Sequence, residues 1–240
     1  MAQIWSFRVD WIEHSTNSRR WFKNWTRLFQ QPVRKLLDNN LPIQIMETLE
    51  ERIKRVLQED VQIVPYNHAW PRMFEEEKAQ LRDSLPAELI KRIEHFGSTA
   101  IPNLAAKPII DILVEVASLE ETKKRIVPVL EAQGYDYFWR PTHGEDGPPF
   151  YAWFIKRDSA GNRTHHVHMV EHTFEHWDRL LFRDYLIEHP AIAREYEILK
   201  MKLSRDHRND RVAYTSGKTE FIGRVTRTAK KYYATQQQAN

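Results

Sequence analysis

Two histidines that alternate along one predicted strand are the residues best suited to chemistry in this sequence. His166 and His168 lie in the run THHVHMVE, and strand side chains alternate between faces, so the two imidazoles point to the same side. Such a pair can bind a metal ion, transfer protons or form a buried hydrogen-bond network. A histidine-triad hydrolase would need a third histidine at the next alternate position, where the sequence has Val170, so we exclude that class.

Two carboxylates on an apolar strand form the second candidate group. Residues 109–116 are short, β-branched and preceded by Pro108, which predicts a buried strand. Asp111 and Glu115 share one face of it and follow a turn that contains Gly97 and Ser98. Charged side chains on a buried strand need a partner or a function, so the position of these two carboxylates favours a binding or catalytic site.

The strand that carries the histidines should pair with the strand of Asp111 or with its neighbour, because strands 150–157 and 163–171 form a predicted hairpin. That pairing would place His166 or His168 within reach of Asp111 and near Ser98. An acid and a base in contact could transfer protons to and from a substrate.

The pattern of apolar residues predicts the elements that position these groups. Strands are expected at residues 61–64, 109–116, 134–139, 150–157 and 163–171, and helices at 70–84, 119–133, 174–188, 190–207 and 217–233. This order predicts an α/β (α+β) fold, a small mixed sheet flanked by helices.

Charge is distributed unevenly along the 240 residues. Residues 1–36 carry a net charge of +5 and residues 199–231 a net charge of +7, which leaves −9 for the remainder of a chain with net charge +3. We expect a helical extension at residues 1–60, a core domain at 61–233 and a tail at 234–240. Basic residues beside a tryptophan stripe suit RNA, and the candidate RNA-binding residues are Arg19, Arg20, Lys23, Arg27, Arg224, Arg227 and Lys230. The alternative is a set of ordinary solvated helix faces.

The composition excludes several classes of protein. The sequence has no cysteine, which excludes disulfides, zinc–thiolate sites and thiol nucleophiles. No apolar run approaches about 18 residues, and residues 1–14 carry charges where a signal peptide needs its apolar centre. We therefore expect a cytoplasmic protein that has no membrane partner.

The segment GSTAIPNLAAKPIIDILV, residues 97–114, resembles the signature of the GrpB-type proteins of the nucleotidyltransferase-fold superfamily. The resemblance extends over residues 61–229 and takes in VPYNHAWPRMFEEEKAQL, the HHVHMVE run, FRDYLIEHPAIAREYEILK and YTSGKTEFI. It implies a nucleotidyltransferase-like sheet flanked by helices, here preceded by the helical extension.

The resemblance also implies roles for individual residues. In the superfamily a Gly-Ser turn contacts nucleotide phosphates and an Asp-x-Asp pair holds two divalent metals, which corresponds to Gly97, Ser98 and Asp111. Leu113 occupies the second carboxylate position, and this departure argues against two-metal nucleotidyl transfer. Other matching positions suit a phosphate or the terminal ribose of a nucleic acid, although ordinary ion pairs are the alternative: Arg183, Lys200, Tyr214 and Lys218.

The leading hypothesis is acyl transfer that requires no cofactor. GrpB proteins look similar to fungal arginine-containing cyclodipeptide synthases, which join arginine to a second residue from aminoacyl-tRNA. This resemblance implies arginyl-tRNA and a second charged tRNA as partners, with Asp111, His168, His166 and Ser98 as catalytic residues. Asp111, Glu115 or Glu171 would receive the arginine guanidinium. A second pocket would be lined by Trp139, Phe150, Tyr151 and Trp153.

Two alternatives stay open. The first is a metal-dependent nucleotidyl or phosphoryl transferase of the GrpB type, in which Asp111, Glu115 and His168 hold Mg²⁺ or another divalent ion. The second is a non-catalytic nucleotide- or RNA-binding module. A chelator should abolish nucleotide binding that depends on a metal, whereas tRNA-dependent acyl transfer should proceed in its presence.

Overall fold

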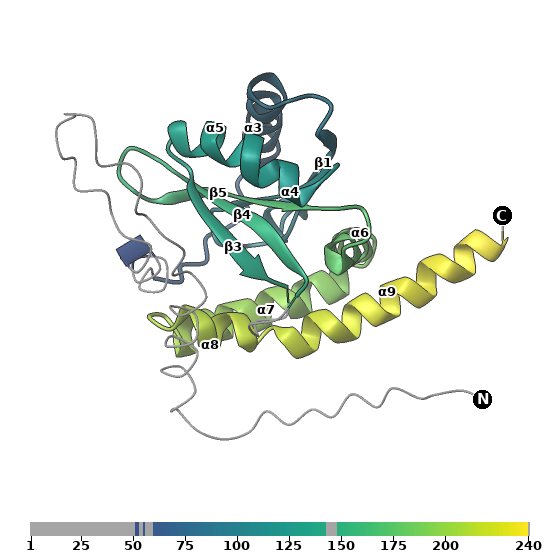
Figure 1. The fold of residues 1–240 in the computed structure, drawn as a ribbon. Helices are drawn as coiled ribbons and strands as arrows, with labels where there is room; N and C mark the ends of the chain where they lie inside the picture. The colour runs from purple at the N-terminus through teal and green to yellow at the C-terminus, as the bar shows by residue number, and fades with distance from the viewer. Residues whose placement is uncertain (1–50, 53–54, 56–59, 143–147, 240) are drawn as a thin grey trace, which may run out of the picture. The chain divides into compact units, whose positions relative to one another are not determined.

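The structure is a computed structural model that describes residues 51–52, 55, 60–142 and 148–239 (Figure 1). The chain divides into two units, Met1–Glu50 and Glu51–Asn240, and every described residue belongs to the second. The predicted helical extension lies outside the described residues except at its C-terminal end. The same holds for Arg19, Arg20, Lys23 and Arg27.

A five-stranded mixed sheet carries the candidate site. Its strands are β1 (Ile90–Phe96), β2 (Ile110–Val116), β3 (Asp136–Pro141), β4 (Phe150–Arg157) and β5 (Arg163–Val170), in the order β1-β2-β5-β4-β3. β2 and β5 are parallel, and the other neighbouring strands are antiparallel. The expected pairing of the histidine strand with the Asp111 strand is therefore confirmed.

Helices flank the sheet on both sides, which confirms the predicted mixed α/β fold. In Figure 1, α3 to α5 lie on one side of the sheet and α6 to α9 gather on the other. Short 3-10 helices cover Ser98–Ala100 and Glu175–Trp177, and a π-helical segment covers Thr122–Ile126. The α-helices are α3 (Trp70–Ser84), α4 (Leu119–Glu121), α5 (Val127–Ala132), α6 (Asp178–Glu188), α7 (Pro190–Asp206), α8 (Arg211–Ser216) and α9 (Thr219–Ala239).

The alternation of side chains separates a core face of the sheet from a polar face. Ile110, Ile112 and Val114 of β2 are fully buried, or nearly so, in one apolar cluster with α3 and α5. Helix α3 contributes Phe74 and Leu81 to this cluster, as its apolar spacing predicted. The intervening residues of β2, including Asp111, must face the other way.

Two expected elements differ from the structure. The strand expected at residues 61–64 is reduced to an isolated bridge between Val64 and Ala106, since Pro65 has no amide hydrogen with which to extend the pairing. The last helix, α9, begins at Thr219, close to the expected start near Gly217, and a separate short helix, α8, precedes it. Helix α9 then continues to Ala239, through residues expected to form a tail.

A second apolar cluster joins the helices on the polar side of the sheet. It contains Phe182 and Leu186 of α6, Tyr196 of α7 and Val225 of α9, together with Ile101 and Leu104 from the loop between β1 and β2. Because these helices pack on that loop, they also fix the residues that surround Asp111. No helix within the described part of the chain combines the length and apolar character needed to cross a membrane.

Candidate functional site

The register between β2 and β5 brings the predicted catalytic residues together. Asp111 is the Cα partner of His166, and Leu113 is the Cα partner of His168. Partners in register point to the same face. The rings of His166 and His168 lie 6.4 Å apart between centroids, which confirms that they share a face.

Asp111, His166 and His168 form a compact group of possible ligands. His166 Nδ1 lies 3.0 Å from Asp111 Oδ1, within hydrogen-bonding distance. One potential ligand atom from each of the three residues lies within 4.8 Å of the others. The Asp111 side chain is 29% exposed and the His166 side chain 10%, so solvent reaches the carboxylate. This arrangement can hold one metal ion or act as an acid–base pair.

The protonation states of these residues at neutral pH suit metal binding. Burial lowers the pKa of His166 to about 3, although the Asp111 carboxylate opposes this shift. Burial also lowers the pKa of His168 well below its usual value. Burial raises the pKa of Asp111, but His166, Lys107 and Lys218 outweigh that effect and lower it overall. Two neutral imidazoles and one carboxylate are the forms that bind metals.

The glycine of the Gly-Ser turn allows the backbone to lie against Asp111. Gly97 has a φ of +74°, a conformation that side chains with a Cβ seldom adopt. A Cβ at this position would lie 2.5 Å from Asp111 Oδ2. Ser98 follows at the start of a 3-10 helix, and its hydroxyl is a hydrogen-bonding partner of Tyr196. The turn therefore packs directly on the carboxylate.

Lysines from distant segments surround the same carboxylate. Lys107 precedes β2, Lys218 lies between α8 and α9, and both ammonium groups face the ring of Tyr214, at 5.3 and 4.3 Å from its centroid. Burial lowers the pKa of Lys218 to about 8, with a further contribution from Arg211, while Asp111 opposes the shift. Within the described residues neither lysine forms an ion pair with a carboxylate. The buried side chain of Tyr214 thus supports two cations.

Arginines complete this cationic region, and the sequence analysis did not identify them. Arg163 precedes the histidines on β5, and its guanidinium lies 3.4 Å from His166 Nε2. Arg140 of β3 lies 4.6 Å from the Trp153 ring centroid, and Arg179 of α6 lies 5.6 Å from that of Phe96. Arg163 therefore lies beside His166, whereas Arg140 and Arg179 lie over rings that contact His168.

Comparison with known proteins adds the family. Residues 60–228 match the family described as GrpB protein. The chain belongs to the GrpB family. The match agrees closely with the residues 61–229 over which the sequence resemblance extends. It covers all five strands of the sheet and the start of α9.

Three relatives illustrate how much of a GrpB protein the chain contains. It is 41% identical to the UPF0157 protein YqkA of Bacillus subtilis over 75% of the chain, but it spans only half the length of that relative. It is 37% identical to glutamate-rich protein GrpB of Alkalihalophilus pseudofirmus, covering 69% of the chain and 94% of the relative. The crystal structure of GrpB from Enterococcus faecalis matches with 38% identity and a TM-score of 0.62, and the match covers 72% of this chain and 99% of that protein's chain. These relatives do not show a relation to cyclodipeptide synthases.

Other residues predicted to bind substrate have structural contacts in this GrpB domain. Glu171 accepts a hydrogen bond of 2.8 Å from the backbone amide of Leu119, at the start of α4. Arg183 donates to the carbonyl of His95 and to the carboxylate of Glu94, which ties α6 to β1. Both residues hold elements together, and neither belongs to the group around Asp111.

Lys200 and Glu197 of α7 hold the loop that leads to β2. Lys200 donates to the carbonyl oxygen of Ala105, and Glu197 accepts from the amide of the same residue at 3.1 Å. Burial lowers the pKa of Lys200 to about 7, and Lys218 adds to this shift. Lys200 thus holds the backbone two residues before Lys107, and its predicted role in binding a phosphate or ribose stays a prediction.

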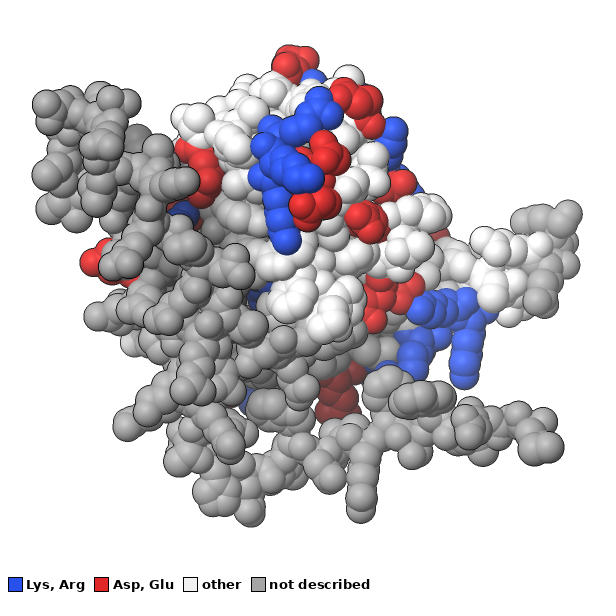
Figure 2. All heavy atoms as spheres, in the orientation of Figure 1, with Lys and Arg blue, Asp and Glu red and all other residues white. Residues whose placement is uncertain are grey.

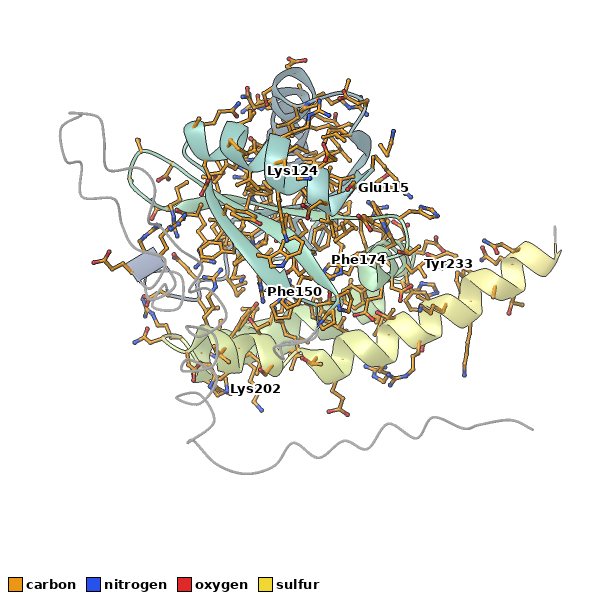
Figure 3. All side chains as sticks on the ribbon, in the orientation of Figure 1. Glu115, Lys124, Phe150, Phe174, Lys202 and Tyr233 are labelled. Atoms are coloured by element: carbon orange, nitrogen blue, oxygen red, sulfur yellow. The ribbon has the colours of Figure 1, made fainter. Side chains whose placement is uncertain are left out.

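Glu115 and the four aromatic residues predicted to line a second pocket do not lie together. Glu115 Oε1 lies 3.5 Å from His172 Nδ1 at the end of β2, outside the metal-ligand group of the described residues. Figure 3 shows Glu115 and Phe150 well apart from each other. Trp139 stacks on Phe150 and packs against the main core. Tyr151 and Trp153 instead contact His168, so the four aromatic residues do not form one pocket.

The candidate RNA-binding residues of α9 are exposed. Figure 2 shows blue Lys and Arg side chains projecting along this helix on the face viewed. Arg224 lies 3.7 Å from Glu195, and Lys230 lies 2.6 Å from Asp178. Exposed ion pairs of this kind are weak and remain available to a polyanion, so RNA binding by α9 stays a prediction.

Proposed function

We propose that this GrpB protein is a metal-dependent transferase that acts on a nucleoside triphosphate and transfers a nucleotidyl or phosphoryl group. The observation that carries the proposal is one carboxylate and two neutral histidines surrounded by partly buried cations. Buried charges need partners of opposite sign, and the described residues around Lys107 and Lys218 supply mainly the charge of Asp111. A triphosphate supplies several negative charges that these cations can bind.

The donor set fits one divalent ion held by Asp111, His166 and His168. Two imidazoles and one carboxylate suit Fe²⁺ and Zn²⁺ better than Mg²⁺, which prefers oxygen ligands, and Mn²⁺ can use the carboxylate together with the two nitrogens. Leu113 is fully buried where the superfamily has a second carboxylate, and its Cα partner His168 offers a nitrogen ligand in that region instead. When bound, the ion would neutralise charge on the phosphate oxygens.

The side chains around the ligands then bind and orient the triphosphate. Lys107 and Lys218 donate hydrogen bonds to non-bridging phosphate oxygens, and the absence of a side chain at Gly97 lets the turn approach them. The oxygen of the acceptor forms a bond to phosphorus, and the phosphoanhydride bond breaks. Pyrophosphate or nucleoside diphosphate leaves, and the acceptor proton passes to solvent. Phosphoryl transfer depends mainly on such positioning and electrostatic stabilisation.

Transfer of an aminoacyl group from tRNA is the second candidate, and the exposed basic residues of α9 favour it. Two observations weaken its arginine-specific form. The cations around Asp111 would repel an arginine guanidinium, and Glu171 already accepts the amide of Leu119. This candidate requires no divalent ion, so the two functions make opposite predictions for a chelator.

Titration calorimetry with non-hydrolysable adenosine and guanosine triphosphate analogues tests the proposal. In the presence of Mn²⁺ at least one analogue should bind, and excess EDTA should abolish its binding. The double variant Lys107→Gln/Lys218→Gln should bind that analogue at least about 10-fold more weakly, because two charge-assisted hydrogen bonds are lost. Lys124→Gln is the matched control, since Lys124 is 59% exposed and pairs with Glu120.

Three results would contradict the proposal. They are nucleotide binding that survives EDTA, an affinity that does not respond to the double substitution, and absence of binding by either analogue. If the protein also forms amide products from charged tRNA in EDTA, acyl transfer replaces phosphoryl transfer as the function.

A further inference from the structure

We propose that Arg140 and Arg179 form a second anion-binding subsite, which receives an oxyanion group of the acceptor molecule. The acceptor would then be a phosphorylated or carboxylated compound rather than a neutral alcohol. The identity of the ligand as an acceptor rests on the proposed function. Anion binding at this subsite can be tested without it.

The two arginines come from different elements and meet beside His168. The guanidinium of Arg140 in β3 lies 4.6 Å from the ring centroid of Trp153, and that ring lies 6.1 Å from His168 between centroids. The guanidinium of Arg179 in α6 lies 5.6 Å from the ring of Phe96, which in turn contacts His168 edge-on at 5.2 Å. Each guanidinium is thus separated from His168 by a single aromatic ring.

Both guanidinium groups are held by aromatic rings rather than by carboxylates. Among the described residues no carboxylate lies within ion-pairing distance of either arginine, Asp111 and Glu175 attract Arg179 from farther away, and both arginines are partly exposed. A guanidinium that lies over a ring keeps its N–H donors at its edge, in the geometry that binds an oxyanion in bidentate fashion. The apolar faces of the rings lower the local dielectric on one side of each guanidinium, which strengthens its attraction for an anion.

The positive charges divide into two sets along β5. The guanidinium of Arg163 lies 3.4 Å from His166 Nε2, whereas Arg140 and Arg179 lie over the rings of Trp153 and Phe96, which both contact His168. The two rings are 6.4 Å apart, about the advance of two residues along a strand. A ligand group bound beside His166 therefore leaves room for a different group beside His168.

A buried polar atom at the second position also lacks a partner. His168 is 6% exposed, and its Nδ1 has no hydrogen-bond partner among the described residues. The nearby Nε1 of Trp153 is likewise without a partner. Buried polar atoms are normally satisfied in folded proteins, so these two favour a polar ligand between the arginines and the histidine.

Calorimetric titration of inorganic phosphate tests this subsite. Phosphate should bind to the free protein and also to the protein saturated with Mn²⁺ and the non-hydrolysable triphosphate. In the double variant Arg140→Gln/Arg179→Gln the phosphate affinity of the saturated protein should fall at least about 10-fold, while its nucleotide affinity changes less than about 2-fold. Arg140→Lys/Arg179→Lys keeps the charges and should retain part of the phosphate affinity.

Arg92→Gln is the matched control, because Arg92 also lies over an aromatic ring, at 5.2 Å from Trp177, but has Glu94 as its ion-pair partner. That variant should bind phosphate as the wild type does. Circular dichroism of each variant verifies that it is folded.

The outcomes separate this inference from the proposed function. Unchanged phosphate binding in the folded Arg140→Gln/Arg179→Gln variant overturns the subsite and leaves the nucleotide site intact. If Arg140→Gln/Arg179→Gln and Lys107→Gln/Lys218→Gln each lose phosphate affinity and nucleotide affinity to the same extent, phosphate and nucleotide share one site. That result also overturns the second subsite. If no nucleotide binds, but phosphate still binds to the free wild type and is lost in the arginine variant, the subsite stands without the proposed function.

Discussion

The Asp111→Asn variant should bind Mn²⁺ at least about 100-fold more weakly than the wild type, and its Mn²⁺-dependent nucleotide binding should disappear. Asp111 is the anionic member of the Asp111, His166 and His168 group, and a neutral amide is a much poorer metal ligand. The substitution keeps the shape of the side chain and its place against Gly97, so the fold should survive. Calorimetry with Mn²⁺ gives the affinity, and circular dichroism verifies the fold.

Glu115→Gln is the matched control for this substitution. Glu115 lies on the same strand and face, but outside the ligand group of the described residues. Removing its charge should leave the Mn²⁺ affinity within about 2-fold of the wild type, less than about 0.5 kcal/mol. An Asp111→Asn protein that is folded and binds Mn²⁺ normally would contradict the assignment of Asp111 as a metal ligand. If only Glu115→Gln lost Mn²⁺ affinity, the metal site would lie nearer the C-terminal end of β2.

Glu77→Ala should destabilise the domain by about 3 kcal/mol. The Glu77 side chain of α3 is 2% exposed, and it accepts hydrogen bonds from the Tyr135 hydroxyl and from the ammonium group of Lys156 on β4. The substitution leaves both donors without their partner, which costs more than the contact itself contributes. Urea unfolding followed by circular dichroism measures the change in the free energy of unfolding.

The neighbouring residue provides the control for Glu77. Glu76 is 64% exposed and lies 3.8 Å from Arg72 in the same helix. Glu76→Ala should therefore change stability by less than about 0.5 kcal/mol. Equal effects of the two substitutions would show that Glu77 does not anchor α3 to the β3–β4 side of the sheet.

The position of the catalytic candidates followed from the sequence because strand alternation is a local property. Alternation along β2 placed Asp111 on the face opposite its apolar core residues, and alternation along β5 placed His166 and His168 on a single face. The predicted hairpin then indicated that the histidine strand pairs with the Asp111 strand or its neighbour. The structure confirms each step through the register of Asp111 with His166. Local periodicity also predicted α3 with the bounds Trp70–Ser84 that the structure has.

The cationic surroundings could not be predicted in the same way. Lys107, Arg140 and Arg179 are separated by tens of residues, and only the sheet order and the packing of α6 bring them to one face. Single basic residues in polar segments give no local signal of this kind. The KPIID segment offered one indication, since Lys107 lies four residues before Asp111 in the motif.

Motif membership alone did not predict the structural contacts of three residues, whose binding roles stay predictions. Glu171, Arg183 and Lys200 lie in the segments that resemble the family, yet their contacts in the structure are with backbone groups of Leu119, His95 and Ala105. Polar residues that satisfy buried backbone groups recur within motifs as readily as ligand-binding residues do. The structural contacts therefore became visible only in three dimensions.

The most direct measurement is a crystal structure of the protein grown with Mn²⁺ and a non-hydrolysable nucleoside triphosphate, with anomalous diffraction recorded for manganese. The account predicts one manganese peak between Asp111, His166 and His168, with the phosphates contacting Lys107 and Lys218. A well-ordered structure with no manganese at these three residues, or with the triphosphate bound elsewhere, would contradict it.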